Sequence, residues 1–316
     1  MLPRDVYFDF TTDSPGFWEG FWERRGGLGL GGSDPDSVSP SLKRFHRELW
    51  SRELPCGRRM ELEDEYGGYL AWVGMRFSSD SITSSFNYER CRPLIEDVYS
   101  HMDDHRSYVE SYLRRTYTIG GCIIFPRHRN SINQCRGTNR KVSDRWDLTL
   151  ECIRRFYEGE ESPLGWCLEQ DRGFFDLFTD FRGYVDFLFL QDCITPDYSE
   201  VVIWTDIEPF VDDPVPRDGD EYLSWMDRNM DFVDRRNRRI ARFLVSLLAL
   251  PLRWLESESD RFHGRQANLY IEPGTLLRDE VLSGRRLHRF PLLRQPCRGL
   301  HFRSLALRRH NAKGSY

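Results

Sequence analysis

The chain has 316 residues and a formal net charge of −5, and 39% of its residues are hydrophobic, 14% aromatic and 30% charged. The aromatic content excludes disorder over the main body, since disordered chains are poor in aromatic residues, and the length suffices for a sizeable core. No segment approaches the roughly 18 apolar residues of a membrane-spanning helix. The polar start after Met1 predicts no signal peptide, so we expect a cytoplasmic protein without a membrane partner.

Positive charge is concentrated toward the C-terminus. Residues 253–316 contain 13 basic and 6 acidic residues, and from residue 281 onward there are nine basic residues and no acidic one. A basic tail can contact nucleic acid or another anionic surface, whereas the acidic balance of the preceding residues argues against a general nucleic-acid binder. We predict one domain over residues 1–250 and an arginine-rich extension over 251–316 that is disordered or loosely packed.

The eight cysteines do not form a recognisable metal or disulfide pattern, because none are spaced as CxxC. Several, such as Cys122 and Cys167, have apolar or glycine neighbours on both sides. Buried free thiols in a reduced compartment are therefore favoured over disulfides or a zinc site.

The N-terminal segment predicts short elements around a glycine-rich loop. Residues 6–10 have the character of a short strand, and aromatic residues at helical spacing predict one or two turns of helix over 17–22. Residues 26–40 predict a loop. Its glycines fit the GxGxxG spacing, but no clear strand precedes them and Asp34-Pro35 follows where a helix must open. A flexible loop is therefore favoured over a phosphate-binding one.

The next segment predicts a helix followed by short strands. Ser39 and Pro40 are typical of a helix start, and this helix extends to about Trp50. A second helix begins at Pro93. Strands are expected between the two helices, at residues 69–72, 75–77 and 82–86.

The middle of the chain carries the clearest strand signal, at residues 116–125. Gly120 and Gly121 within it predict either a bulge or a backbone that another group approaches closely. A polar loop follows over 127–141. Ser143 then has the character of the N-cap of a further helix.

The remaining elements are mostly helical. Residues 174–193 predict an apolar helix, 201–204 a strand, and 219–250 a long helix. Taken together, the elements predict an α+β fold in which a small mixed or antiparallel sheet is packed by several helices. The poorly ordered basic extension follows it.

The strand, the polar loop and the helix after it form the most suggestive region for a functional site. Loops that leave rigid strands often carry function, and the side chains of Asn133, Arg136 and Arg145 suit recognition of phosphate or carboxylate. Gly120 and Gly121 are included as candidate ligand-binding residues. The competing interpretation is an ordinary solvated loop, since Asn, Ser, Gly and Arg are common loop residues.

The candidate catalytic carboxylates are Glu151, Asp80 and Asp144. Glu151 lies four residues after Asp147 on the predicted helix, so the two could act together in acid–base chemistry or metal binding. Alternatively, Glu151 pairs with Arg155 in a surface ladder. Asp80 lies in a hydroxyl-rich turn, where an aspartate either contacts a ligand or caps the turn.

Two further pairs of residues are weaker candidates. Asp186 and Arg182 are four residues apart in an apolar helix, which favours a structural ion pair; an unpaired buried carboxylate would instead be a functional candidate. His101 and His105 have the spacing of two ligands on one helix face. No HExxH, phosphate-loop, kinase, zinc-finger or GxSxG motif is present, and we predict no metal site.

Several segments share a pattern with one known family. They are residues 34–40, 45–51, 78–82, 117–121, 124–126, 132–134, 136–137, 144–155 and 180–187. In these segments the sequence resembles DUF6994, a bacterial family of unknown function, over roughly residues 5–240. The resemblance implies a bacterial, actinobacterial source but no activity, cofactor or catalytic residue. Members of the family end soon after the stretch that is here 236–240, so the remainder departs from the family pattern.

Two functional hypotheses follow from the sequence. The first is an enzyme acting on a phosphate-bearing ligand, a nucleotide or nucleic acid, in which Arg136 and Arg145 hold phosphate and Glu151 or Asp80 handles a proton or a metal. It requires the side chains of Asn133, Arg136 and Glu151 to converge with Asp80 or Asp186 in one cleft. The second is a non-catalytic binding or regulatory protein, for instance of a phage-defence or toxin-type locus. The sequence leaves the cofactor and the oligomeric state open.

Overall fold

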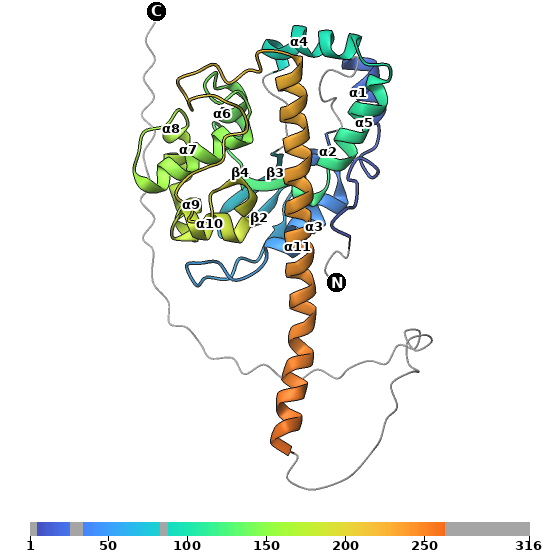
Figure 1. Cartoon of the computed structure of the whole chain (residues 1–316). Coiled ribbons are helices and arrows are strands. Elements are labelled where there is room, and N and C mark those ends of the chain that lie inside the picture. Colours follow the sequence, from blue (N-terminus) through green and yellow to red (C-terminus); the bar gives the residue numbers. More distant parts are fainter. Residues whose placement is uncertain (1–4, 26–33, 83–87, 263–316) are drawn as a thin grey trace, which may run out of the picture. The chain divides into compact units, whose positions relative to one another are not determined.

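A computed structural model describes residues 5–25, 34–82 and 88–262 (Figure 1). The chain divides into two units, Met1–Arg261 and Phe262–Tyr316, and the described residues belong almost entirely to the first. None of the helices in the described part is long and apolar enough to cross a membrane. The extension over residues 251–316 lies almost wholly outside the described residues, so its disorder or loose packing stays a prediction.

A four-stranded antiparallel sheet lies at the centre of the described unit. Its order is β1-β2-β3-β4, from Glu63–Asp64 through Leu70–Trp72 and Met75–Ser81 to Cys122–Pro126. The last two strands pair over five positions, from Phe77 opposite Pro126 to Ser81 opposite Cys122. Every residue of β4 is buried, so helices and loops cover this strand on both faces. The α+β prediction is confirmed.

Helices occupy most of the remaining described chain. The N-terminal helices are α1 (Phe17–Arg25), α2 (Pro35–Val38), α3 (Pro40–Trp50), α4 (Tyr88–Ser100) and α5 (His105–Thr116). After the sheet come α6 (Ile132–Thr138), α7 (Trp146–Glu158), α8 (Gly165–Gln170), α9 (Arg172–Phe175), α10 (Phe181–Leu188) and the long α11 (Gly219–Phe262). Three short 3-10 turns are η1 (Ile119–Gly121), η2 (Asp176–Phe178) and η3 (Gln191–Cys193). The predicted start of α3 is confirmed, because the Ser39 side chain accepts a hydrogen bond from the amide of Leu42.

Helix α11 is anchored to the sheet through the turn η1. The fully buried Arg236 donates from Nη1 to the carbonyls of Gly120 and Cys122, at 2.9 and 2.8 Å, and from Nε to the carbonyl of Leu188 at 3.0 Å. Asn237 accepts the amide of Gly120 at 2.7 Å. Buried backbone groups need such partners, so α11 completes the hydrogen bonding of the segment that leads into β4.

The glycine pair makes this close approach possible. A Cβ atom at Gly120 would lie 2.4 Å from the carbonyl oxygen of Val233 on α11, and one at Gly121 would lie 1.7 Å from the carbonyl oxygen of Thr116. The predicted close approach is therefore present, but the predicted bulge is wrong. The space that a ligand was expected to use at these glycines is filled by the protein's own backbone.

Several predicted strands are shorter than expected or absent. Residues 6–10 are turns, and the amide of Phe10 bonds to the carbonyl of Tyr117 outside any strand. In the segment 116–125, regular pairing begins only at Cys122, because the 3-10 turn precedes it. Segment 201–204 makes only an isolated bridge, from Val201 to Ile194. Residues 83–86 of the strand expected at 82–86 lie outside the described residues.

Helix boundaries also differ from the prediction. The polar loop 127–141 contains α6, and the helix expected from Ser143 begins at Trp146, because Ser143 and Asp144 adopt left-handed backbone conformations with φ of 52° and 62°. Segment 174–193 is broken into short pieces. Pro93 lies inside α4 rather than at its start. Helix α11 continues through the domain boundary that we predicted at 250/251 and ends at Phe262.

The described cysteines agree with the predicted thiols. All seven of them are free; Cys56 is exposed and the others are buried, while Cys297 lies outside the described residues. The ion pair of Arg182 and Asp186 spans 3.8 Å, but both side chains are largely exposed, at 68% and 45%. Asp186 is thus not the buried carboxylate that its apolar neighbours suggested.

Candidate functional site

Arg136 and two of the predicted catalytic carboxylates come together in the interior. Nη1 of Arg136 donates to Asp80 Oδ2 at 2.9 Å and to the Ser81 carbonyl at 3.0 Å, and Nη2 donates to the Asp144 carbonyl at 2.9 Å. Nε lies 3.3 Å from Thr149 Oγ1. Arg136 is fully buried, and all three of its side-chain nitrogens are engaged. The residue ties α6 to β3 and α7, and its guanidinium is not presented to a phosphate group.

Arg145 forms a second, separate buried centre. Its Nε and Nη2 bind both carboxylate oxygens of Asp147, at 3.0 and 2.5 Å, and its Nη1 binds the carbonyl of Pro214 at 2.9 Å. Asp147 also accepts the amide of Trp204 at 2.9 Å. Such a two-pronged pair is among the strongest hydrogen-bonding arrangements in proteins. Here it fixes the segment 204–214 to the start of α7.

Glu151 and Asn133 do not join the carboxylates around Arg136. Glu151 binds Arg155 at 2.7 Å, the pairing that the ladder interpretation anticipated, and also Arg154 at 2.8 Å, but its side chain is buried and not at the surface. Asn133 donates weakly to the hydroxyl of Ser78, at 3.4 Å. The structure thus brings Asp80, Asp144 and Arg136 together and places Glu151 with its own arginines. The single cleft that the enzyme hypothesis required is not formed.

Asp80 nevertheless has an unusual titration. Burial, together with the nearby charges of Asp144 and Asp34, raises the pKa of Asp80 to about 7, against the opposing effect of Arg136. Burial and the charges of Asp34 and Asp80 raise the pKa of Asp36 well above its usual value. Such groups are candidates for proton handling, although buried ion pairs show the same behaviour for structural reasons.

A chain of hydrogen bonds leads from the core to Asp36. The indole of Trp50 donates to Nδ1 of His46 at 2.9 Å, Nε2 of His46 lies 3.0 Å from the Ser79 hydroxyl, and Ser79 donates to Asp36 at 2.9 Å. Because an indole can only donate, the proton of His46 lies on Nε2. Burial and the charge of Arg236 lower the pKa of His46 to about 3. His46 is therefore neutral and cannot act as the base for Ser79.

A small cavity of about 170 Å³ borders this chain, between α2, α3 and β3. Its wall is partly polar, from Asp36 and Ser79, and partly apolar, from Leu70 and Phe77. Across the described ranges, no group of three or more His, Cys, Asp or Glu side chains is placed to hold a metal ion. The expectation that His101 and His105 share one helix face is wrong, because α4 ends at Ser100 and α5 begins only at His105.

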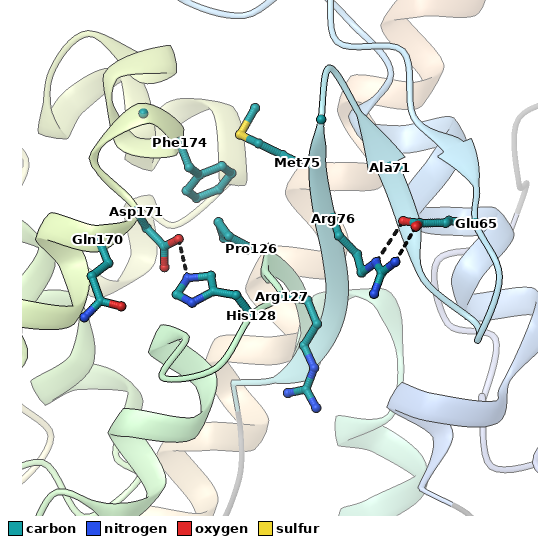
Figure 2. Close-up of a pocket in the computed structure, with 12 residues that line it drawn as sticks. Glu65, Ala71, Met75, Arg76, Pro126, Arg127, His128, Gln170, Asp171 and Phe174 are labelled. Atoms are coloured by element: carbon teal, nitrogen blue, oxygen red, sulfur yellow. Dashed lines mark hydrogen bonds and ion pairs between the residues drawn. The ribbon is translucent and has the colours of Figure 1, made fainter. Parts of the chain in front are cut away.

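A larger cavity, of about 560 Å³, opens at the end of β4. Figure 2 shows it between the β2–β3 hairpin, the residues that follow β4, and the corner between α8 and α9. Apolar side chains form part of its wall: Ala71, Met75, Pro126 and Phe174. Charged and amide side chains lie around them, which is the composition typical of small-molecule sites.

Two arginines line this cavity, one on β3 and one directly after β4, and only the first is paired with a carboxylate. Arg76 on β3 binds both carboxylate oxygens of Glu65, at 3.0 and 2.5 Å. Arg127 is held to β3 through its backbone, since its amide donates to the Arg76 carbonyl at 2.7 Å. Among the described residues, no carboxylate pairs with the Arg127 guanidinium. In the view of Figure 2 this side chain extends between His128 and Arg76.

His128 adds a second positive charge to the cavity. Its Nδ1 lies 2.7 Å from the carbonyl of Arg129, and its Nε2 lies 2.8 Å from Asp171 Oδ1. The carbonyl can only accept a hydrogen bond, and so can Asp171 when it is ionised; both ring nitrogens then carry protons. Burial opposes the charged ring, but these two hydrogen bonds and the charge of Asp171 together raise the pKa of His128 above its usual value. His128 is therefore an imidazolium held between two oxygens.

Asp171 completes this pair from the other side of the cavity. Its side chain is only 5% exposed. Its Oδ1 binds His128, whereas its Oδ2 is buried without a partner among the described residues. Burial raises the pKa of Asp171, and His128 opposes this shift. Between the two pKa values the pair is ionised, which leaves the charge of Arg127 uncompensated.

The sequence reasoning missed these residues, although a signal was present. Pro126 ends the most buried strand, and Arg127 and His128 are the first side chains after it. Residues at the end of a rigid strand are well placed for binding. The amide-rich part of the same segment, which the composition favours as a site, folds as α6 and buries Arg136.

Comparison with known proteins identifies the family and no function. Residues 4–240 match a family of unknown function (DUF6994), and the chain therefore belongs to that family. The matched range agrees with the resemblance seen in the sequence. No curated protein and no solved structure matches the chain.

Proposed function

We propose that the protein binds a small phosphate-bearing ligand in the cavity at the end of β4, and that its role there is binding rather than catalysis. One observation carries the proposal. Arg127 presents a guanidinium without a carboxylate partner among the described residues, beside the imidazolium of His128, in a cavity of about 560 Å³. Typical ligand sites have volumes of about 300–1,000 Å³.

The charge of the cavity favours an anion. Glu65 neutralises Arg76 and Asp171 neutralises His128, so Arg127 supplies a net positive charge. A guanidinium binds phosphate in a two-pronged way. His128 offers the anion no hydrogen bond, because both of its N–H groups are already used, and its charge offsets that of Asp171.

The apolar wall and one amide suggest the rest of the ligand. Met75, Pro126 and Phe174 offer a surface for an organic group next to the phosphate. Gln170 lines the same cavity and is exposed, and its amide can both donate and accept. These features favour a small phosphorylated molecule over a nucleic acid, whose backbone needs several cationic contacts.

The experiment is a calorimetric titration with inorganic phosphate, a sugar phosphate and adenosine monophosphate. The two organic phosphates are each compared with their dephosphorylated form. We expect the phosphorylated probes to bind and Arg127→Ala to weaken that binding at least tenfold, since a hydrogen bond to a charged group contributes about 1.5–3 kcal/mol. Arg129→Ala is the matched control, because Arg129 is exposed in the same segment and keeps its backbone carbonyl. Equal binding by both variants would refute the site.

A second candidate function is acid–base catalysis at Asp80, which the pKa of about 7 favours. A carboxyl group that titrates near neutral pH is suited to proton transfer. Hydrolysis of a phosphate-ester panel that is lost in Asp80→Asn, with the fold retained, would support it. Activity that survives this substitution would remove Asp80 from the reaction.

A further inference from the structure

We propose that anion binding in the cavity at the end of β4 is coupled to the protonation of His128, so that the site holds its ligand at acidic to neutral pH and releases it as the pH rises. This inference rests on the proposed anion site. It adds a regulatory property that follows from the two hydrogen bonds of the His128 ring.

While Asp171 is ionised, the two contacts of the His128 ring fit the doubly protonated ring. Nδ1 faces the carbonyl oxygen of Arg129 at 2.7 Å, and Nε2 faces the carboxylate of Asp171 at 2.8 Å. Neither oxygen has a proton to offer when Asp171 is ionised. Loss of either ring proton would bring a nitrogen lone pair against an oxygen lone pair. A neutral ring must therefore give up one of its two contacts.

Deprotonation of His128 changes the cavity in two ways. The cavity loses one positive charge, so the ionised Asp171 is no longer compensated and opposes an incoming anion. In addition, His128 is the residue directly after Arg127, so a ring that leaves its partners alters the segment that positions the guanidinium. Both effects lower the affinity for an anion.

The other groups near the pair do not replace the lost charge. Cys135 on α6 and Cys167 on α8 lie near Asp171, and burial raises the pKa of both thiols, so they stay neutral near pH 7. Arg127, on the segment of His128 itself, repels the imidazolium and lowers its pKa.

Across the cavity, Arg76 and Glu65 form a closed ion pair and add little net charge. An anion bound near Arg127 would offset the repulsion between Arg127 and His128. Proton binding and anion binding therefore favour each other, and linkage requires the two effects to be reciprocal.

The direction in which pH changes the anion affinity follows from the pKa of His128. The pKa of His128 in the folded protein is raised above the usual value of 6.5, so the imidazolium is fully present below that value and is lost as the pH rises through the raised pKa. Affinity for an anion of fixed charge should fall over the same range, by at most tenfold per pH unit, because one proton is involved.

Sulfate is the appropriate probe because its charge is constant in this range, whereas a phosphate ester gains charge near pH 6. Sulfate binding would be measured calorimetrically between pH 6 and 9, in buffers of different ionisation enthalpy. We expect affinity to decline above the pKa of His128 and binding to take up a proton in the same range. His128→Gln should bind sulfate weakly and without pH dependence.

The outcomes separate the two proposals. Sulfate binding that is constant from pH 6 to 9 in the unaltered protein would overturn the coupling and leave the anion site in place. Failure of sulfate and of every phosphorylated probe to bind at any pH would overturn both. Nitrogen NMR of the His128 ring tests the premise without a ligand: a singly protonated ring at pH 6 would also overturn the coupling.

Discussion

Arg136 and Arg127 lie nine residues apart in the sequence, but their guanidinium groups have different surroundings in the folded protein. Arg136 is fully buried and uses all of its nitrogens on Asp80, Thr149 and two carbonyls. Arg127 is half-buried, and its guanidinium meets no carboxylate among the described residues. The first arginine holds elements together, and the second is available to a ligand.

The difference teaches that composition alone does not identify a binding arginine. The sequence around Arg136 is richer in amides and hydroxyls than that around Arg127, and this composition favours a binding site around Arg136. Those polar groups instead satisfy each other or the backbone, as buried polar groups must. Four substitutions test the contrast, in order of decreasing expected effect on stability.

Arg136→Met should have the largest effect. Removing one partner of a buried ion pair leaves the other charge uncompensated, at a cost of about 3–5 kcal/mol. We expect the free energy of unfolding, measured by chemical denaturation, to fall by that amount. Arg140→Ala is the control, since Arg140 is exposed at the end of the same segment and should change stability by less than about 0.5 kcal/mol. Similar losses in the two variants would contradict the assignment of Arg136 as a structural residue.

Asp80→Asn should flatten the pH dependence of stability. The pKa of Asp80 is raised from 3.8 to about 7 in the folded protein, so the folded state binds more protons than the unfolded state between these values, and stability falls as the pH rises through them. Between pH 4 and 8 the unaltered protein should lose stability on the order of 4 kcal/mol through Asp80, and the variant should not show this loss. Denaturation curves at several pH values measure this; parallel pH profiles would show that Asp80 titrates normally.

His128→Gln should have a smaller effect that depends on pH. The raised pKa of His128 means that its interaction with Asp171 stabilises the fold below about pH 6.5 and is lost as the pH rises further. We expect a loss of about 0.5–1.5 kcal/mol at pH 6, since the ring is partly exposed, and a smaller loss at pH 9. A difference that grows with pH would mean that the ring is neutral in the folded state.

Arg127→Ala should change stability least, by less than about 0.5 kcal/mol, although it is expected to weaken ligand binding most. Thermal unfolding of the variant with and without a phosphorylated probe measures both effects. The unaltered protein should gain stability when the probe binds its folded state, and the variant should not. A large loss of stability in the unliganded variant would show that Arg127, like Arg136, supports the fold.

The sequence predicted the α+β class, the family and the start of α3, because these depend on composition and on local capping. The extent of strand pairing was not predictable. Residues 116–120 have strand-like side chains, but backbone groups of this segment form hydrogen bonds with Arg236 and Asn237, which lie more than one hundred residues later. The cavity was missed for the same reason. The charge of His128 depends on Asp171, which lies 43 residues later in the sequence at the end of α8 and is brought to His128 by the fold.

The anchoring of η1 by α11 has a consequence for the order in which the protein is made. The backbone of Gly120 and Cys122 is synthesised early, but the side chains that satisfy it, Arg236 and Asn237, leave the ribosome more than one hundred residues afterwards. Until then the nascent chain carries an unfinished strand with exposed polar backbone at the centre of its future core. The fold can therefore be completed only after residues at the very end of the family's shared segment have been synthesised. Folding of this unit is thus expected late in translation.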